Sequence, residues 1–163
     1  MKKLLYLPLL LVLLKCSPDP VQQDLLNYIN VEMPKVATVE SEAITAYESV
    51  SGENYQNDSI MYFTMVETVL PKYEEFYTTL QSIKPATEVV ASLHKEYVHA
   101  AADQMEAFKL IIEAIEKQDA QIITKANEDL AEGRALLKMW RADLDSACVK
   151  HNVVFNSDEE EKE

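Results

Sequence analysis

ITKANEDLAEGRALLKMWRADLDSA, residues 123–147, is the stretch that decides the fold. Apolar and small residues recur along it at alternating steps of three and four. This is the a and d spacing of a heptad, and it places these side chains on one face of a helix. The positions are Ile123, Ala126, Leu130, Gly133, Leu137, Trp140, Leu144 and Ala147. The stretch therefore predicts a long helix that packs against other helices.

Three earlier segments show the same periodicity, which predicts three more helices. The first is the least regular of them. Their apolar positions are Leu25, Ile29, Met33, Val36, Ala43, Ala46 and Val50 in the first; Tyr62, Val66, Val69, Tyr73, Phe76, Leu80 and Ile83 in the second; and Val90, Leu93, Tyr97, Ala100, Gln104, Phe108, Ile111 and Ile115 in the third.

Helix ends are marked between these segments. SGEN at 51–54 ends the first segment and Pro85 ends the second. NDS at 57–59 offers N-cap residues for the second helix. Thr87 and Asp119 are the expected N-caps of the third and fourth, because their side-chain oxygens accept hydrogen bonds from free helix N–H groups.

Four long helices joined by short loops pack as antiparallel neighbours. We therefore expect an all-α fold, an up-down-up-down antiparallel four-helix bundle over residues 21–155. In that topology the start of the first helix and the end of the fourth lie at one end, and the loop at 51–58 and the tip at 117–119 lie at the other. Pro34 and Pro71 fall inside the periodic segments and should kink them. Alternatively, Pro34 is the first residue of a separate helix.

The chain begins with MKKLLYLPLLLVLLKC, a positive start, an apolar run and a cysteine. This layout is typical of a secretory signal, and the run is too short to span a membrane. Together with the SPDP that follows at 17–20, it resembles bacterial lipoprotein signals, although Lys15 stands where that family has Gly, Ala or Ser. The resemblance implies a signal peptide over 1–15, a diacylglycerol on Cys16 and a short linker over 16–20. An uncleaved or otherwise processed leader is the alternative.

Two stretches, LHKEYVHAAADQMEAF at 93–108 and IEAIEKQDAQIITKANEDLAEGRALLKMWRADL at 112–144, are similar in style to small bacterial helical-bundle lipoproteins of uncharacterised function. That resemblance implies a location at the bacterial cell membrane or outer membrane, facing the periplasm or the exterior. It implies no known active site.

The charge of the chain is strongly negative, at −13 over the whole sequence. Without the three lysines of the leader, 12 basic residues stand against 28 acidic ones, a net charge of −16. Such a charge repels phosphate backbones and anionic headgroups, so we expect no nucleic-acid partner. The acidic tail over 156–163 is expected to be disordered.

The sequence holds no sign of catalysis or of a cofactor. It has no GxSxG, no HExxH and no Gly-rich phosphate loop. Glu96 and His99 form one Glu-x-x-His pair, where a di-metal bundle needs two. We expect no metal. Cys148 is interpreted as a small buried hydrophobe, with a disulfide to Cys16 as the alternative.

A few residues are candidates for binding. Gly133 should lie level with Ala100 and Ala101, so that the layer either is filled by Tyr73 or leaves a small pocket. His94 borders a helix seam and is the other candidate for holding a ligand. Tyr55, an aromatic residue in a polar loop far from the anchor, is a candidate contact for a protein partner.

From these observations we expect a non-enzymatic interaction or structural module, anchored to the membrane by its lipid and binding an unidentified protein. The alternative is a bundle that binds a small ligand or cofactor at the Ala100/Gly133 layer or at His94. Exposed apolar positions on the first helix would also favour a homo-oligomer.

Overall fold

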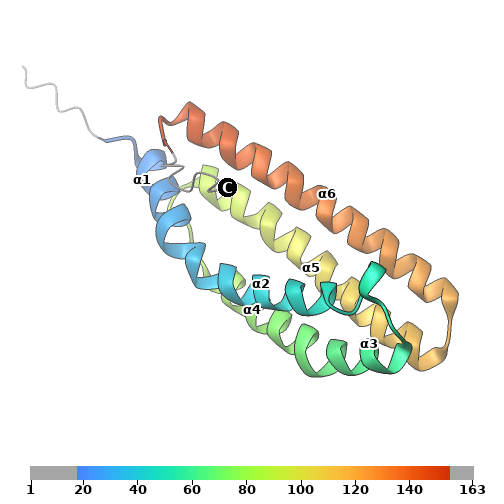
Figure 1. Cartoon of the computed structure of the whole chain (residues 1–163). Coiled ribbons are helices and arrows are strands. Elements are labelled where there is room, and N and C mark those ends of the chain that lie inside the picture. The colour runs from blue at the N-terminus through green and yellow to red at the C-terminus, as the bar shows by residue number, and fades with distance from the viewer. Residues whose placement is uncertain (1–17, 155–163) are drawn as a thin grey trace, which may run out of the picture.

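The computed structural model describes residues 18–154, and every regular element among them is helical (Figure 1). The predicted all-α class is therefore confirmed. Cys16, the leader and the acidic tail lie outside the described residues. The α-helices are α1 (Pro20–Asn27), α2 (Pro34–Glu48), α3 (Asp58–Thr64), α4 (Leu70–Ser82), α5 (Glu88–Lys117) and α6 (Ala120–Lys150), with a 3₁₀ turn η2 (Gly52–Asn54) and two π-helical segments, η1 (Tyr28–Glu32) and η3 (Met65–Val69).

The two π segments precede the two prolines that the periodic segments contain. In η1 the N–H of Met33 donates to the carbonyl of Tyr28, five residues earlier, and Pro34 then opens α2. In η3 the N–H of Leu70 donates to Met65, and Pro71 follows at once. Proline lacks an N–H and its ring crowds the carbonyl four residues earlier, and a π turn widens the helix at that point. The helical backbone therefore widens into a π turn before each proline and continues as α-helix from there.

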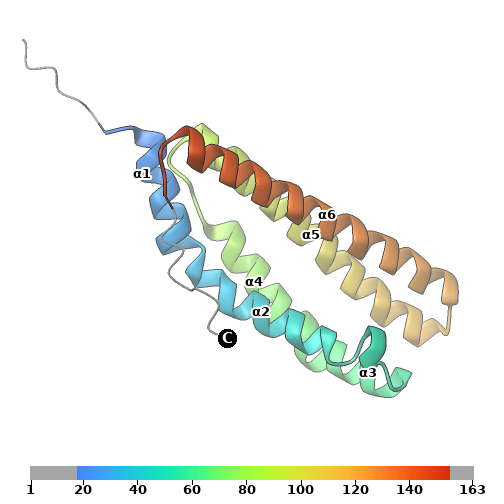
Figure 2. The ribbon, with the colours of Figure 1, turned by 45° about the horizontal axis from the view of Figure 1, so that its top comes forward.

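The expected N-caps are confirmed. Asn57 accepts from the N–H of Ile60, Thr87 from Val90, and Asp119 from Gln121. Gln118, in the turn between α5 and α6, takes a left-handed conformation with φ 53°. This short turn lets α5 and α6 run side by side as an antiparallel pair (Figure 2).

The helices form an elongated molecule with its two ends well separated. α6 packs on α5, α2 packs on α4, and α4 and α5 join the two pairs. At one end the start of α1 meets the end of α6, where His151 Nδ1 lies 2.6 Å from Asp19 Oδ2 and the Gln22 side chain donates to the carbonyl of Asn152 at 3.0 Å. α3 and the α5–α6 turn lie at the opposite end, which we call the distal end (Figures 1 and 2).

Aromatic rings fill the centre of the core. They come from α2, α4, α5 and α6 and touch edge to face, in tilted pairs or stacked, which adds to the stabilisation from apolar burial. Tyr73, Phe76 and Phe108 are fully buried. The rings that contact one another are Tyr47, Tyr73, Phe76, Tyr97, Phe108 and Trp140.

Candidate functional site

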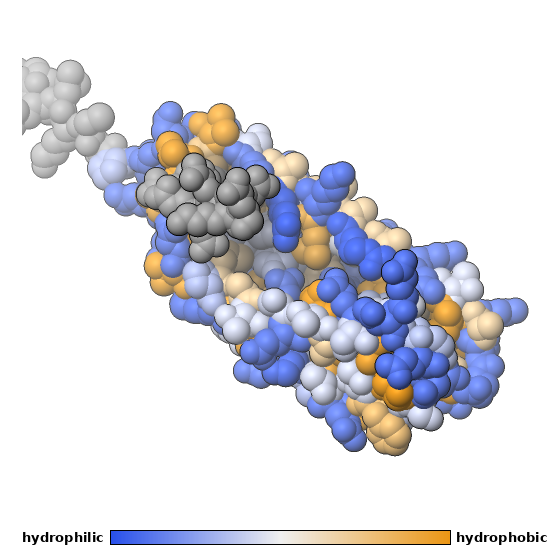
Figure 3. All heavy atoms as spheres, in the orientation of Figure 1, coloured by the Kyte–Doolittle hydropathy of each residue, from blue (hydrophilic) through white to orange (hydrophobic). Residues whose placement is uncertain are grey.

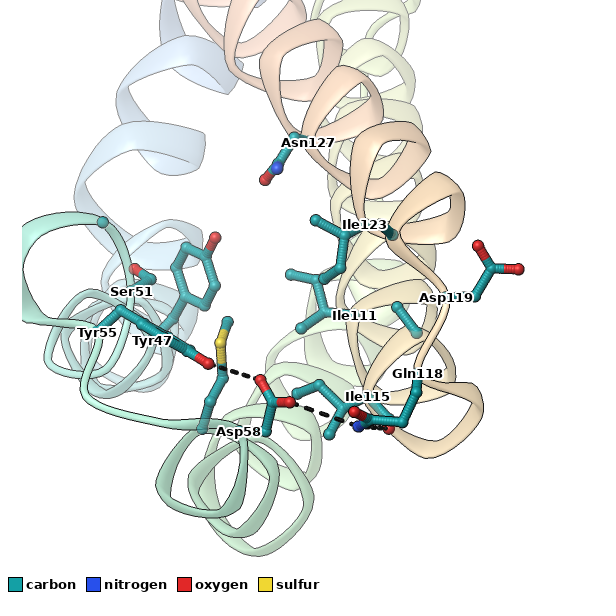
Figure 4. A pocket seen from close by; sticks show the side chains of 14 residues that line it. Tyr47, Ser51, Tyr55, Asp58, Ile111, Ile115, Gln118, Asp119, Ile123 and Asn127 are labelled. Atoms are coloured by element: carbon teal, nitrogen blue, oxygen red, sulfur yellow. Dashed lines mark hydrogen bonds between the residues drawn. The ribbon is translucent and has the colours of Figure 1, made fainter.

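A cavity of about 530 Å³ opens at the distal end (Figure 4). Its walls come from the end of α2, the loop after it, the start of α3, and the facing ends of α5 and α6. The lining residues are Tyr47, Ser51, Gly52, Tyr55, Asp58, Met61, Ile111, Ala114, Ile115, Gln118, Asp119, Ala120, Ile123 and Asn127. The volume lies in the range of sites that bind small molecules or single side chains.

Asp58 is the hydrogen-bonding centre of the cavity rim. Its Oδ1 accepts from the Tyr55 hydroxyl at 2.6 Å, and its Oδ2 lies 3.4 Å from the Gln118 amide nitrogen (Figure 4). The Gln118 amide also donates to the carbonyl of Ile115 at 2.7 Å. Because its hydroxyl donates a hydrogen bond to the Asp58 carboxylate, the pKa of Tyr55 is raised. These bonds tie the loop before α3 to the α5–α6 turn.

The floor of the cavity is apolar and the rim is acidic. Met61, Ile111 and Ile123 supply aliphatic surface, whereas Asp58 and Asp119 supply negative charge, and no Lys, Arg or His of the described residues lines the cavity. Such a site can take an apolar side chain that has a basic or amide neighbour.

Apolar side chains are exposed on α3 and η3 near this cavity. Phe63 is 58% exposed, and Ile60 and Val66 are each 38% exposed. They follow one another at steps of three residues. Figure 3 shows apolar surface among the charged side chains at the end where α3 lies. Apolar side chains gathered on a charged surface are typical of a contact for another protein.

The sequence-predicted contact residue Tyr55 lies on the rim of the distal cavity and is 46% exposed. The other predicted residues lie in the interior. Tyr73, Ala100 and Ala101 are fully buried, and a Cβ on Gly133 would lie 3.7 Å from the Ala100 carbonyl. This layer lies between the distal cavity and a second cavity described below. Its four residues line neither of these two cavities.

His94 is buried and belongs to a local polar contact. Its Nδ1 lies 3.1 Å from the Tyr28 hydroxyl, and the two rings meet edge to face. Burial lowers the pKa of His94, with a smaller effect in the same direction from the charge of Lys84. Both residues therefore serve to join α1–η1 to α5.

A second cavity, of about 330 Å³, lies between α2 and α6. Its lining includes Tyr97, whose hydroxyl donates to Glu40 Oε2 at 2.6 Å. Sequence reasoning missed Glu40. The signal was present, because the seam of the first segment jumps from Val36 to Ala43, and position 40 is where an apolar residue should stand between them.

Other candidates from the sequence are placed as follows. Cys148 is buried near the end of α6 and has no disulfide partner among residues 18–154, and burial raises the pKa of its thiol. His99 is mostly exposed, and its Nδ1 lies 3.7 Å from Asp103 Oδ2. Within residues 18–154 no three His, Cys, Asp or Glu side chains are grouped to hold a metal ion. In the same range no helix combines the length and apolarity needed to cross a membrane.

No family model, no characterised protein and no solved structure matches this chain.

Proposed function

We propose that this protein is a lipid-anchored module of the bacterial envelope that binds a protein partner through its distal end and catalyses no reaction. Cys16 would carry the lipid after removal of the leader. The lipid would attach the protein to the cell membrane or the outer membrane, and the domain would face the periplasm or the exterior. The high negative charge argues against nucleic acid as the partner.

The observation that carries this proposal is the position of Tyr55, Ile60 and Phe63. Tyr55 lines the distal cavity, and Ile60 and Phe63 are exposed on α3, the helix that contributes Asp58 and Met61 to that cavity, at the end opposite to the start of the described chain. A lipid at Cys16 would hold the Asp19–His151 end at the membrane. The distal end would then point outward, where a partner can reach it.

The chemistry of the cavity indicates what the partner presents. An apolar side chain fits the floor, and a neighbouring Lys or Arg would find Asp58 and Asp119 at the rim. Opposite charges around an apolar anchor favour specificity and fast association. The partner is therefore an extracytoplasmic protein with an apolar residue next to basic ones. A second copy of this chain, itself acidic, fits this description less well.

We further propose that the fold is an up-down-up-down antiparallel four-helix bundle. In this interpretation residues 20–48 count as one helix and 58–82 as the second, each adjusted by its π segment. The right-handed helical backbone angles of Met33, φ −61° and ψ −39°, between η1 and α2 support this counting. α5 and α6 are the third and fourth helices.

The test is photo-crosslinking in living bacteria that express the full chain. A benzophenone amino acid placed at Tyr55 or at Phe63 should capture one defined partner, and the same label at Met139, 61% exposed on α6, should not. Asp58→Asn should reduce the capture. Equal capture at Met139, or no adduct at either distal position, would overturn the proposal.

A further inference from the structure

The cavity between α2 and α6 has the size and walls of a small-molecule site. Its volume of about 330 Å³ lies at the lower end of the range for such sites. Met33, Val36 of α2 and Leu144 of α6 give it aliphatic walls, and Tyr97 and Trp140 give it an aromatic one. α6 packs chiefly on α5, which leaves its side toward α2 partly open.

Glu40 places a half-buried negative charge beside this cavity. Its carboxylate accepts a hydrogen bond from Tyr97, a lining residue, and forms no ion pair within 4 Å among residues 18–154. Burial raises the pKa of Glu40, while the Tyr97 hydrogen bond and the charge of Arg141 act in the opposite direction. Burying part of a carboxylate without a direct cationic partner lowers the stability of the fold, and a bound cation would offset that loss.

The aromatic wall suits a cation as well. Tyr97 and Trp140 are stacked, with ring centres 4.2 Å apart and planes 17° from parallel. The stacked faces cover one another, and the outer face of either ring can attract a cation through its electron-rich centre. The indole N–H of Trp140 is buried and has no acceptor within the described residues; because an ammonium group only donates, a water would have to pair this N–H. Buried polar atoms are rarely left unpaired in proteins unless a water or a ligand pairs them.

Two charged residues line the cavity. Arg141 would oppose a cation there, and Asp145, on the same helix, would favour it. With Glu40, the negative charges at the site outnumber the positive one. We propose that this cavity binds a small organic amine with an apolar body, its ammonium group directed to Glu40 and its body held against Met33, Val36 and Leu144.

The chain offers a clean signal for testing this site, because Trp140 is its only tryptophan. The full chain is titrated with 2-phenylethylamine, and with 3-phenylpropanoate as the charge-reversed control. We expect a saturable change of Trp140 fluorescence with the amine, with a Kd of about 1 mM or lower, and binding of the carboxylate weaker by about tenfold or more. No saturable response to the amine, or an equal response to both probes, would overturn the inference.

Variants then test whether Glu40 is the residue that binds the ammonium group. Glu40→Gln keeps an acceptor for Tyr97 and removes the charge, so it should weaken amine binding by about tenfold. The matched control is Glu42→Gln, two residues away on the surface of α2, which should leave binding unchanged. Arg141→Gln should tighten binding. If Glu40→Gln, folded by circular dichroism, binds the amine like the original chain, the site is not the one proposed. This test is independent of any protein partner at the distal end.

Discussion

Asp24 of α1 accepts both polar hydrogens of Thr87, the N-cap of α5. The Thr87 N–H and the Thr87 hydroxyl each lie 2.7 Å from Asp24 Oδ2, and the N–H of Ala86 donates to the other carboxylate oxygen at 3.1 Å. Asp24 is 7% exposed. A side chain of the first helix therefore fixes the start of the third long one, and Thr87 in turn caps α5.

Asp24→Ala should destabilise the protein strongly for this reason. The change removes three hydrogen bonds to a carboxylate and leaves the Ala86 and Thr87 donors unpaired, so we expect a loss of about 3 kcal/mol in the free energy of unfolding. Urea denaturation measures it. Asp143→Ala, at an exposed position of α6, is the control and should change the free energy by less than about 0.5 kcal/mol. A loss for Asp24→Ala no larger than that would contradict the reading of this contact.

Glu40→Gln should raise the stability at neutral pH, although it should weaken amine binding. The pKa of Glu40 is raised in the folded protein, mainly by burial, so its ionisation is less favourable there than in the unfolded chain. The stabilisation that the protonated form brings is therefore present below the unfolded pKa and is lost as the pH rises through the folded one.

Melting temperatures at pH 7 and pH 4 test this. Glu40→Gln should melt higher than the original chain at pH 7, and the difference should shrink at pH 4, below the ordinary pKa of a glutamate, where Glu40 is mostly protonated in both states. Glu42→Gln should not show this dependence on pH. A melting temperature of Glu40→Gln below the original at pH 7 would mean that the ionised carboxylate stabilises the fold.

His94 should make the protein less stable in mild acid. Burial lowers the pKa of its imidazole, so below about pH 6.5 the unfolded chain takes up a proton that the folded chain does not. The free energy of unfolding should fall as the pH drops from 7 to 5, and His94→Gln should lose part of that fall. His99→Gln, at a mostly exposed position of α5, should retain it. Identical slopes for the two variants would show that His94 does not contribute.

Gly133→Ala should stabilise α6. A Cβ at this position would lie 3.7 Å from the Ala100 carbonyl and the Gln104 Cβ, an ordinary van der Waals separation. Replacing a glycine inside a helix by alanine favours the helix by about 1 kcal/mol. Gly133→Leu should instead lose about 1–3 kcal/mol, because the added atoms would have to displace α5. If both variants are tolerated equally, this layer has more space than the packing indicates.

The sequence was sufficient to predict features that depend on residues close to one another in the chain. The N-caps Asn57, Thr87 and Asp119 were predictable because a capping side chain acts on an N–H two or three residues away. A departure from regular helix at Pro34 and Pro71 was expected from the chemistry of proline, and so was the start of a separate helix at Pro34. The form of the departure was not, because a π turn inserts one residue into a helix to keep both flanking faces on the core, and this depends on the neighbours.

The candidate sites were less accessible to prediction. Tyr55 could be chosen from its place in a polar loop, but its partner Asp58 was read only as a capping residue. Glu40 was overlooked because Val36 and Ala43 are a heptad apart. The heptad spacing is therefore kept even though the position between them is polar. Asp24 carries no pattern at all, since its contact with Thr87 joins residues 63 positions apart.

Membrane attachment through Cys16 is the claim from which the outward orientation of the distal end follows. The intact mass and the membrane partitioning of the full chain and of Cys16→Ser, both produced in a bacterium, test it most directly. We expect the original chain to begin at Cys16, to carry acyl mass and to sediment with membranes, and Cys16→Ser to lose all three properties. An original chain that retains Met1 and stays in the supernatant would contradict the account.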